Sequence, residues 1–414
     1  MGSHLFSDRL DALLRQRQMT GPRLAAATSY SRGYVWEVVS GRKPAVADFA
    51  AACDEALQAD GALVAALAVP DPAGTGQLHR RRLLVDLGVL GLAGPLAATE
   101  AVRHGFGAAV HQDVNLDEWD EIADEYAHAY CTTPPARLLP DLTAHIDALG
   151  RQIPAAHPSA ARGLSRVGGQ LAAIMAVTLA STGEPRRAKR WWRTACDAAD
   201  RSGDRRTQAW VRGWEVVDGL YEARPVPEIL DRAAEATALV KDAPVCAGTA
   251  QVYSGLAQTL AVAGRRDEAL RALARVADLT EQMPADVSAD DESLLGWPEV
   301  RLRHTESYVH TWLGNGNAAF AAQEQALRLY RPALPPRQPT QVKLHRAGCM
   351  LRDGDVSGGL AYANTVLDEL PAEHHNDHVY AIGRLAVAFV PEREHGRRAA
   401  VELRERLASA PTVA

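Results

Sequence analysis

Breaks rich in glycine recur along the chain from about residue 116, and the segments between them have the length and pattern of helices. Such breaks fall at Gly183, Gly264, Gly314 and Gly354, and others fall at proline clusters. The segments between breaks are roughly 15 to 20 residues long, and none alternates apolar and polar residues as a half-buried strand does. This pattern predicts an all-α fold for most of the chain.

The segments around these glycines are similar to one another. Each has an apolar helix, then a glycine and a few polar residues, then a second helix with small residues near its start. The copies are 173–199, 256–276, 307–327 and 344–367. Their glycines are about 40 to 50 residues apart, and one unit lacks its glycine near Ala223. A hairpin of this kind cannot bury its apolar face alone, so we expect neighbours to stack and to form a concave groove, which is a binding surface.

Aromatic and polar side chains on the predicted first helices are the candidates for lining this groove. They come from three consecutive units and comprise Trp210, Trp214, Gln251, Tyr253, Arg303, His304, Tyr308 and His310. Such a groove suits an amphipathic small molecule or a peptide. Tryptophans four residues apart share a helix face, and that spacing is equally typical of a packed core. Groove and core therefore stay alternatives for these tryptophans.

Near the N-terminus, residues 20–44 predict two short helices joined by a tight turn. Thr20 is a suitable N-cap for the first helix, and Ser31 can cap the second. In the second helix, Tyr34, Val35 and Val38 recur as a half-buried helix requires. The sequence that follows is typical of a helix C-terminus: Gly41, Arg42, Lys43 and Pro44.

This stretch resembles the helix-turn-helix of the lambda-repressor-like (Xre) family, and it is similar to actinobacterial regulators that carry a long helical-repeat region. The matching residues are Leu24-Ala25, Tyr30-Ser31, Tyr34-Val35 and Ser40 to Pro44, and residues 49–63 fit the fourth and fifth helices of that fold. The sequence departs from the family pattern at Val39, often a glutamate, and at Trp36, often a small polar residue. The resemblance implies a five-helix DNA-binding domain.

The resemblance also implies which residues contact DNA. Ser31, Arg32 and Gly33 would enter the major groove, because the N-terminal residues of a recognition helix reach base edges, and Arg32 could bind a guanine. The other candidates are Tyr34, Trp36 and Glu37 on the same helix, and Thr20, Arg23, Arg42 and Lys43 at the DNA backbone. Packing is the alternative for Trp36, and a solvated helix end is the alternative for Arg42 and Lys43.

The later segments resemble tetratricopeptide repeats. The match is clearest at Leu256, Ala257, Gly264, Ala269 and Leu270, although the spacing is longer than that of the standard repeat. The resemblance implies an α-solenoid of elongated, degenerate hairpins.

Charge limits how such a chain could bind DNA. The net charge is −6, and residues 1–60 carry seven Lys and Arg against seven Asp and Glu. Affinity for DNA would depend on local placement, with basic residues on one face and Asp48, Asp54 and Glu55 turned away from it.

A cluster of proline and glycine at 70–76 marks the end of the first domain. We expect a DNA-binding domain at 1–70, a linker and apolar connecting helix at 71–115, and a repeat domain for ligand sensing and dimerisation at 116–414. The apolar run within the connecting segment is too short to span a bilayer and contains Asp86 and Pro95, so we expect no membrane association.

Several classes of site find no support in the residues. The five cysteines are scattered without a C-x-x-C pair, which indicates free thiols in a reducing, cytoplasmic setting. His374, His375 and His378 form the only metal-like cluster, and a solvated loop is favoured over a metal site there. Phosphate-loop, nucleophile-elbow, zinc-protease and dinucleotide motifs are absent from the sequence. We therefore expect no enzyme, no cofactor and no metal.

These observations favour a cytoplasmic, homodimeric transcriptional regulator. Its partners would be a double-stranded DNA operator and a small-molecule or peptide effector held by the repeat domain, which would modulate operator binding. The alternative is a protein–protein interaction scaffold that uses the repeat groove, with DNA binding secondary. The support for either function is analogy with proteins of similar architecture.

Overall fold

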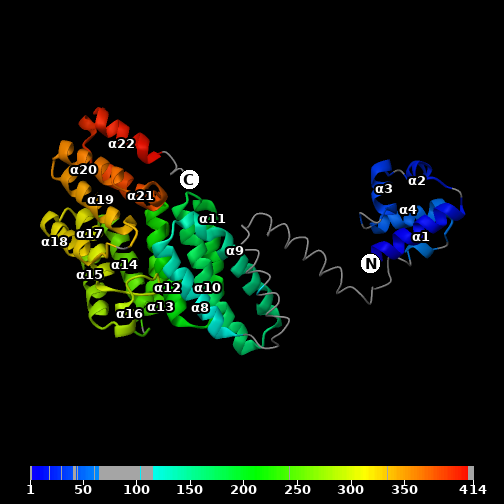
Figure 1. Ribbon diagram of the computed structural model, residues 1–414, viewed down its shortest axis with the longest axis horizontal. Coiled ribbons are helices and arrows are strands. Elements are labelled where there is room, and N and C mark those ends of the chain that lie inside the picture. The colour runs from blue at the N-terminus through cyan, green and yellow to red at the C-terminus, as the bar shows by residue number, and fades with distance from the viewer. Residues whose placement is uncertain are drawn as a thin grey trace. The chain divides into compact units, whose positions relative to one another are not determined.

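The computed structural model describes residues 2–17, 19–28, 30–40, 43, 45–59, 61–64, 103, 115–241, 243–332 and 334–408. Within these residues every regular element is helical and no strand occurs, so the predicted all-α class is confirmed for this part of the chain. The chain divides into two compact units, Met1–Leu92 and Ala93–Ala414 (Figure 1). The predicted boundary near residue 70 and most of the predicted connecting segment lie outside the described residues.

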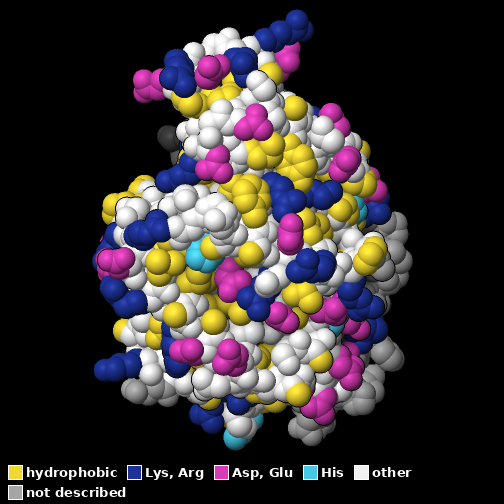
Figure 2. Space-filling view, turned by 90° about the vertical axis from the view of Figure 1, so that its left-hand side faces the viewer, with side chains coloured by type: hydrophobic (Ala, Val, Ile, Leu, Met, Phe, Trp, Pro, Cys, Tyr) yellow, Lys and Arg dark blue, Asp and Glu magenta, His cyan; other side chains and the backbone are white. Residues whose placement is uncertain are grey.

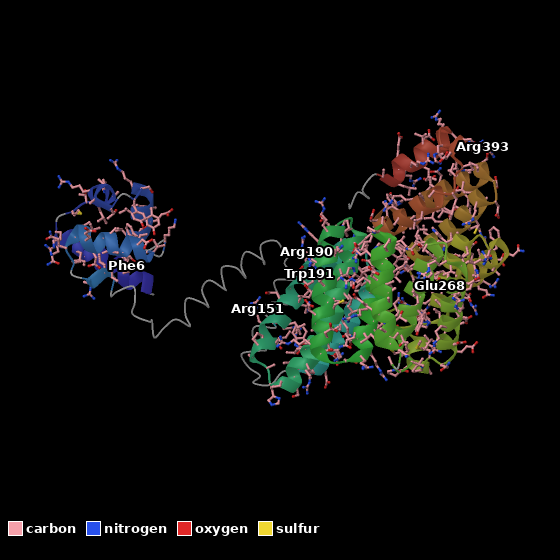
Figure 3. The ribbon with its side chains drawn as sticks, turned by 180° about the vertical axis from the view of Figure 1, so that it is seen from behind. Phe6, Arg151, Arg190, Trp191, Glu268 and Arg393 are labelled. Atoms are coloured by element: carbon pink, nitrogen blue, oxygen red, sulfur yellow. The ribbon has the colours of Figure 1, made fainter. Side chains whose placement is uncertain are left out.

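The described residues of the N-terminal unit form four short helices and a helical turn at residues 62–64. The helices are α1 (Gly2–Gln16), α2 (Gly21–Thr28), α3 (Arg32–Val39) and α4 (Ala47–Leu57). Their apolar faces meet in one core, in which Phe6, Leu24 and Phe49 are fully buried. Figure 3 shows Phe6 inside this unit. The core lies on one side of α3, so the other side of that helix is left exposed.

The carboxylate of Asp54 connects α4 to residues 61–64, which include the helical turn. Its Oδ1 accepts a hydrogen bond from the backbone N–H of Gly61 at 2.8 Å, and its Oδ2 accepts from Leu63 at 2.9 Å and from Val64 at 2.7 Å. The first N–H groups of a helical turn have no partner within the turn, so these bonds satisfy them. Asp54 is buried for this reason, whereas Asp48 and Glu55 are exposed.

In the described part of the C-terminal unit, the α-helices pair in consecutive hairpins, with the short α16 (Ala285–Ala289) between two of them. The hairpins are α8 (Leu116–Thr132) with α9 (Pro135–Gln152), α10 (Pro158–Ser181) with α11 (Pro185–Ser202), α12 (Arg205–Tyr221) with α13 (Val226–Val240), α14 (Ala247–Val262) with α15 (Arg266–Glu281), α17 (Glu299–Leu313) with α18 (Gly316–Leu329), α19 (Arg337–Arg352) with α20 (Val356–Asp368), and α21 (Asp377–Val387) with α22 (Arg398–Ala408).

The first helices of successive hairpins lie side by side. From α10 onward each contacts the next, in the order α10, α12, α14, α17, α19 and α21, as Figure 1 allows the reader to follow. The predicted glycine turns are confirmed: Gly183, Gly264, Gly314 and Gly354 have φ values of 81°, 72°, 70° and 95°. Ala223 takes the corresponding place in the unit without a glycine, with a φ of 53° that L-amino acids disfavour.

Helix α10 is the most apolar element of this unit. It alone among the described helices is long and apolar enough, by length and composition, to cross a membrane, and 78% of its apolar window is buried inside the unit. It packs against α8, α9, α11 and α12, so it serves as a core helix. Figure 2 shows basic and acidic side chains interspersed over one face of the unit, without a large area of a single charge.

Candidate functional site

Two places in the described structure are candidates for binding, one in each unit. The first is the exposed side of α3. Ser31 caps this helix as predicted: it has extended backbone angles (φ −67°, ψ 147°), and its Oγ accepts from the Tyr34 N–H at 3.2 Å. Arg32 and Gly33 follow on the surface, and a Cβ added at Gly33 would meet no atom within 4 Å. The start of α3 is therefore open to a partner.

Three further predicted DNA contacts lie around this helix start. A surface hollow between α1, α2 and α3 is lined in part by Thr20, Arg32 and Trp36. The Trp36 side chain is 56% exposed, the largest exposure of a large apolar side chain among the described residues. Arg23 is exposed on α2. The structure thus brings Thr20, Arg32 and Trp36 to one surface.

Tyr34, Glu37 and Lys43 are held by one another and by the core. The Tyr34 ring stacks on Tyr30, with ring centroids 5.2 Å apart, and meets the edge of Phe49 at 5.1 Å. Lys43 Nζ lies 4.9 Å from the centre of the Tyr34 ring and 3.6 Å from Glu37 Oε2. Tyr34 therefore packs, although it was a candidate for DNA contact, and Glu37 and Lys43 form an ion pair. Arg42, the remaining candidate, lies outside the described residues.

The second candidate is a cavity of about 150 Å³ inside the C-terminal unit. An engineered protein cavity of about this volume binds benzene, so one ring of a ligand would fit. Side chains of α8, α10, α12, α14, α17, α19 and α21 reach it, which are first helices of the hairpins. The cavity therefore lies on the side of the stack where a concave surface was expected.

Two connections between hairpins complete the wall of this cavity. One follows α16 and contributes Asp291, Leu294, Trp297 and Pro298; the other follows α18 and contributes Tyr330, Arg331, Leu334 and Pro335. The first is anchored across the unit, because the Leu294 N–H donates to the Ala127 carbonyl at 3.2 Å and Trp210 Nε1 donates to the Leu294 carbonyl at 3.0 Å. It belongs to the longest interval between successive turn residues, counting Ala223 as one of them: 50 residues from Gly264 to Gly314.

Arg301 brings a positive charge to the cavity wall. Its Nη2 donates to the Ser293 carbonyl at 2.8 Å, and its guanidinium lies 5.2 Å from the centre of the Trp214 ring. No ion-pair partner for Arg301 occurs among the described residues, and Asp290 acts on it only from beyond ion-pair distance. Burial lowers the pKa of the Arg301 guanidinium, as expected for a cation that has lost water without gaining an anion.

His304 and Tyr330 form a neutral pair beside Arg301. His304 Nδ1 and the Tyr330 hydroxyl are 2.8 Å apart. Burial, and then the charge of Arg301, lower the pKa of His304 to about 4. Burial also raises the pKa of Tyr330. Both groups are therefore uncharged near neutral pH, and they leave the charge of Arg301 uncompensated.

Asp218, which also lines the cavity, connects α12 to two other helices. Its Oδ2 accepts from Trp192 Nε1 of α11 at 2.8 Å, and its Oδ1 lies 2.9 Å from His378 Nε2 of α21. His378 also stacks near Tyr221, with ring centroids 4.9 Å apart. Oδ2 of Asp218 is therefore hydrogen-bonded within the protein, whereas Oδ1 and His378 Nε2 lie close to each other without forming a hydrogen bond.

The structure brings three of the eight predicted ligand residues to the cavity. Trp214, Gln251 and His304 line it, and they come from three consecutive hairpins as expected. The other five lie elsewhere in the structure. Trp210 is 5% exposed and Tyr308 is fully buried, so both belong to the core, where Tyr308 stacks on Trp312 at 4.4 Å.

The remaining three predicted residues face other surroundings. Tyr253 lines a separate surface hollow between α13 and α15. Arg303 forms ion pairs with Glu299 and Glu306 on its own helix, each at 2.9 Å. His310 Nδ1 accepts a hydrogen bond from Asn315 Nδ2 at 3.2 Å. All three residues lie on first helices of hairpins, as expected. Their spacing alone did not specify which face of the helix each side chain occupies.

The sequence analysis missed the buried polar residues Ser254, Gln258 and Thr305 of the cavity wall, and also Arg301. Ser254 and Gln258 are on the same helix face as Gln251, at intervals of three and four residues, so this periodicity was a usable signal. Nothing in the sequence around 290–298 pointed to the cavity except its length.

The three histidines at 374–378 do not converge. His375 contacts the Tyr380 hydroxyl at 3.1 Å and the Leu370 carbonyl at 3.0 Å, whereas His378 faces Asp218. Within the described residues, no group of three or more His, Cys, Asp or Glu is placed to hold a metal ion.

Comparisons of the chain with protein-family models, with curated proteins and with solved structures find no match.

Proposed function

We propose that this chain is a sequence-specific DNA-binding regulator with a ligand-sensing repeat domain. In this proposal α2 and α3 form a helix-turn-helix of the lambda-repressor type within a five-helix domain, and the hairpins from α8 onward form an α-solenoid of tetratricopeptide-like repeats. The observation that carries the proposal is the start of α3. A capped helix N-terminus presents Arg32 and Gly33 to solvent, and a glycine there is not required by packing.

This geometry suits a recognition helix for physical reasons. The N-terminus of a helix carries partial positive charge and free N–H groups, so it favours the negatively charged DNA backbone and base acceptors. Arg32 and Arg23 are exposed on α3 and α2, while the acidic Asp54 is buried and already bonded. The local surface can therefore be basic although residues 1–60 have equal numbers of acidic and basic side chains.

The cavity supports ligand sensing rather than gripping of a protein chain. A partly open cavity of about 150 Å³ accommodates a small group, whereas a partner protein would need an extended groove. In the proposed mechanism a cytoplasmic homodimer places two recognition helices about 34–36 Å apart, which matches successive major grooves. A ligand that binds one arrangement of the dimer more tightly than another shifts the population and changes operator affinity.

The test is selection of duplexes from a random library by the full-length protein, followed by titration of the enriched site. Gly33→Glu places a carboxylate on the exposed start of α3, where the structure has open space, so the fold should be kept while DNA binding is lost. Arg32→Ala should weaken binding by about 10- to 100-fold and relax the preference at one base pair.

Arg393→Ala is the matched control, because Arg393 is an exposed arginine of the C-terminal unit (Figure 3). It should leave the affinity for the enriched site unchanged. Failure of the wild-type protein to enrich any duplex, or equal loss of affinity with Arg393→Ala and Arg32→Ala, would refute the proposed role of α3.

A further inference from the structure

The cavity of the C-terminal unit has unsatisfied polar groups whose chemistry specifies a ligand. Three features carry this inference: the unpaired guanidinium of Arg301, an indole N–H of Trp214 and the amide oxygen of Gln258. Both the indole Nε1 and the amide Oε1 are buried without a hydrogen-bond partner among the described residues, and both residues line the cavity. Buried polar groups in proteins are nearly always hydrogen-bonded, so orphans grouped at a cavity indicate a bound partner.

A chain of hydrogen bonds fixes what Gln258 can accept. Thr305 Oγ1 donates to the Arg301 carbonyl at 2.8 Å, so the Ser254 hydroxyl, 2.8 Å from Thr305 Oγ1, donates to it. Ser254 Oγ in turn accepts from Gln258 Nε2 at 3.0 Å. The amide nitrogen of Gln258 is thereby hydrogen-bonded. Its Oε1 remains as an acceptor without a partner, and Gln258 is only 4% exposed. A ligand that fits must therefore offer an O–H or N–H donor at that position.

Arg301 specifies the charge of the ligand. No carboxylate of the wall lies within ion-pair distance of Arg301: Asp218 accepts from Trp192 and Asp291 pairs with Arg331. His304 is uncharged near neutral pH, so the guanidinium has no counter-charge at close range. An unpaired buried charge is costly, and a carboxylate is the group that matches the planar fork of an arginine. The stacking of Arg301 on Trp214 fixes the plane of the guanidinium.

The apolar part of the wall specifies the body of the ligand. Val177, Val217, Leu294 and Trp297 line the cavity together with the Trp214 ring. A volume of about 150 Å³ accepts one six-membered ring. Arg331 also lines the cavity, and it pairs with Asp291 at 3.4 Å and with Glu292. Its charge is therefore already compensated and does not compete with Arg301 for the charge of a ligand.

We propose that this cavity binds a small monoanion with a single ring, a carboxylate held by Arg301 and a hydroxyl or amino group that donates to Gln258, that is, a hydroxylated or aminated aromatic carboxylic acid. This assignment rests on the ligand-sensing role of the C-terminal unit and deepens it by naming the ligand class.

The experiment is calorimetric titration of the full-length protein with the three hydroxybenzoate isomers, with benzoate and with the corresponding hydroxybenzamides. At least one hydroxybenzoate should bind. Its neutral amide should bind about 10- to 100-fold more weakly, because it loses the charge-assisted bonds to Arg301, and benzoate should bind about 5- to 10-fold more weakly, because it lacks the donor for Gln258. This comparison of ligands needs no variant.

Variants then assign the two contacts. Arg301→Gln should abolish the preference for the acid over the amide, and Gln258→Leu should abolish the preference for hydroxybenzoate over benzoate. Arg303→Gln is the matched control, because Arg303 is two residues along the same helix, outside the cavity and paired with Glu299 and Glu306. It should leave both preferences unchanged. Thermal unfolding of each variant shows whether its fold is kept.

Two results would overturn the assignment: no binding of any hydroxybenzoate at millimolar concentration, or equal affinity for the acid and its amide. The same protein samples are titrated with the DNA site enriched by selection, without ligand. Ligand binding without any DNA binding would refute the proposed regulator and leave the ligand assignment standing. DNA binding without any ligand binding would refute the ligand assignment and leave the proposed DNA-binding regulator standing.

Discussion

Replacement of Asp54 by alanine should unfold the N-terminal unit while the C-terminal unit stays intact. Asp54 accepts three backbone hydrogen bonds, from Gly61, Leu63 and Val64, at 2.7 to 2.9 Å. Alanine removes all three acceptor contacts and leaves the buried Leu63 N–H without a partner. Hydrogen bonds to a charged group contribute about 1.5–3 kcal/mol each, and contributions within one group are not additive, so the expected loss is about 3–5 kcal/mol.

That loss is large for a unit of this size. Folded domains have free energies of unfolding of roughly 0.05–0.15 kcal/mol per residue, which gives about 3–10 kcal/mol for a domain of about 65 residues. The variant would therefore be partly or wholly unfolded in this unit at 25 °C. Asp54→Asn keeps one acceptor oxygen and should lose less. Asp48→Ala removes an exposed carboxylate in the first turn of the same helix and should lose less than about 1 kcal/mol.

Amide hydrogen exchange of the full-length protein, read peptide by peptide, measures this effect where it occurs. In Asp54→Ala the peptides covering 47–64 should lose protection, and those covering α10 and α11 should exchange as in the wild type. The reasoning is refuted if Asp54→Ala keeps wild-type protection in 47–64, or if Asp48→Ala loses as much.

Three other substitutions test the C-terminal unit, each by urea unfolding. Gly248→Ala should lower the free energy of unfolding by about 3 kcal/mol, because the added Cβ would lie 2.6 Å from the backbone nitrogen of Trp210. Gly150→Ala is the control, because a Cβ there would meet open space, and it should not lower the free energy of unfolding. Ala223→Gly should stabilise by about 1 kcal/mol by relieving the positive φ. Burial raises the pKa of Glu222 from 4.5 to about 7, so the folded state binds this proton more tightly than the unfolded state does. As the pH rises from 4.5 to 7, the free energy of unfolding of the wild type should therefore fall by about 3 kcal/mol relative to that of Glu222→Gln. Free energies of unfolding that change with pH in the same way in both proteins would contradict this.

The turns of the C-terminal unit were predictable because their physical cause is local. A residue that must adopt positive φ favours glycine, and Gly183, Gly264, Gly314 and Gly354 therefore mark hairpin turns in the sequence itself. The same logic explains the cap of α3, since Ser31 bonds a backbone group three residues away. Such features depend on a few neighbouring residues and not on the rest of the fold.

The faces of helices were harder to predict for the opposite reason. Trp210 and Trp214 share a stripe by spacing, yet Trp210 bonds to Leu294 in the core while Trp214 lines the cavity. Which of them faces the cavity depends on the loop before α17, whose position is set by contacts distant in sequence. His304 and Arg303 are adjacent, and only the first faces the cavity, since adjacent residues on a helix point about 100° apart.

The cavity is built where the repeat is least regular, and this has a physical explanation. A regular stack of hairpins buries its first helices against one another and leaves a continuous, open concave surface. Closure of that surface into a cavity requires chain that does not belong to the repeat. Here that chain is supplied by the loop carrying Leu294 and Trp297 and by Tyr330, Arg331, Leu334 and Pro335 after α18. The regular helices then supply side chains of fixed position, such as Gln258 and Arg301. In this chain, the interval that departs from the regular spacing was therefore a better guide to the cavity than any single aromatic residue on a regular helix.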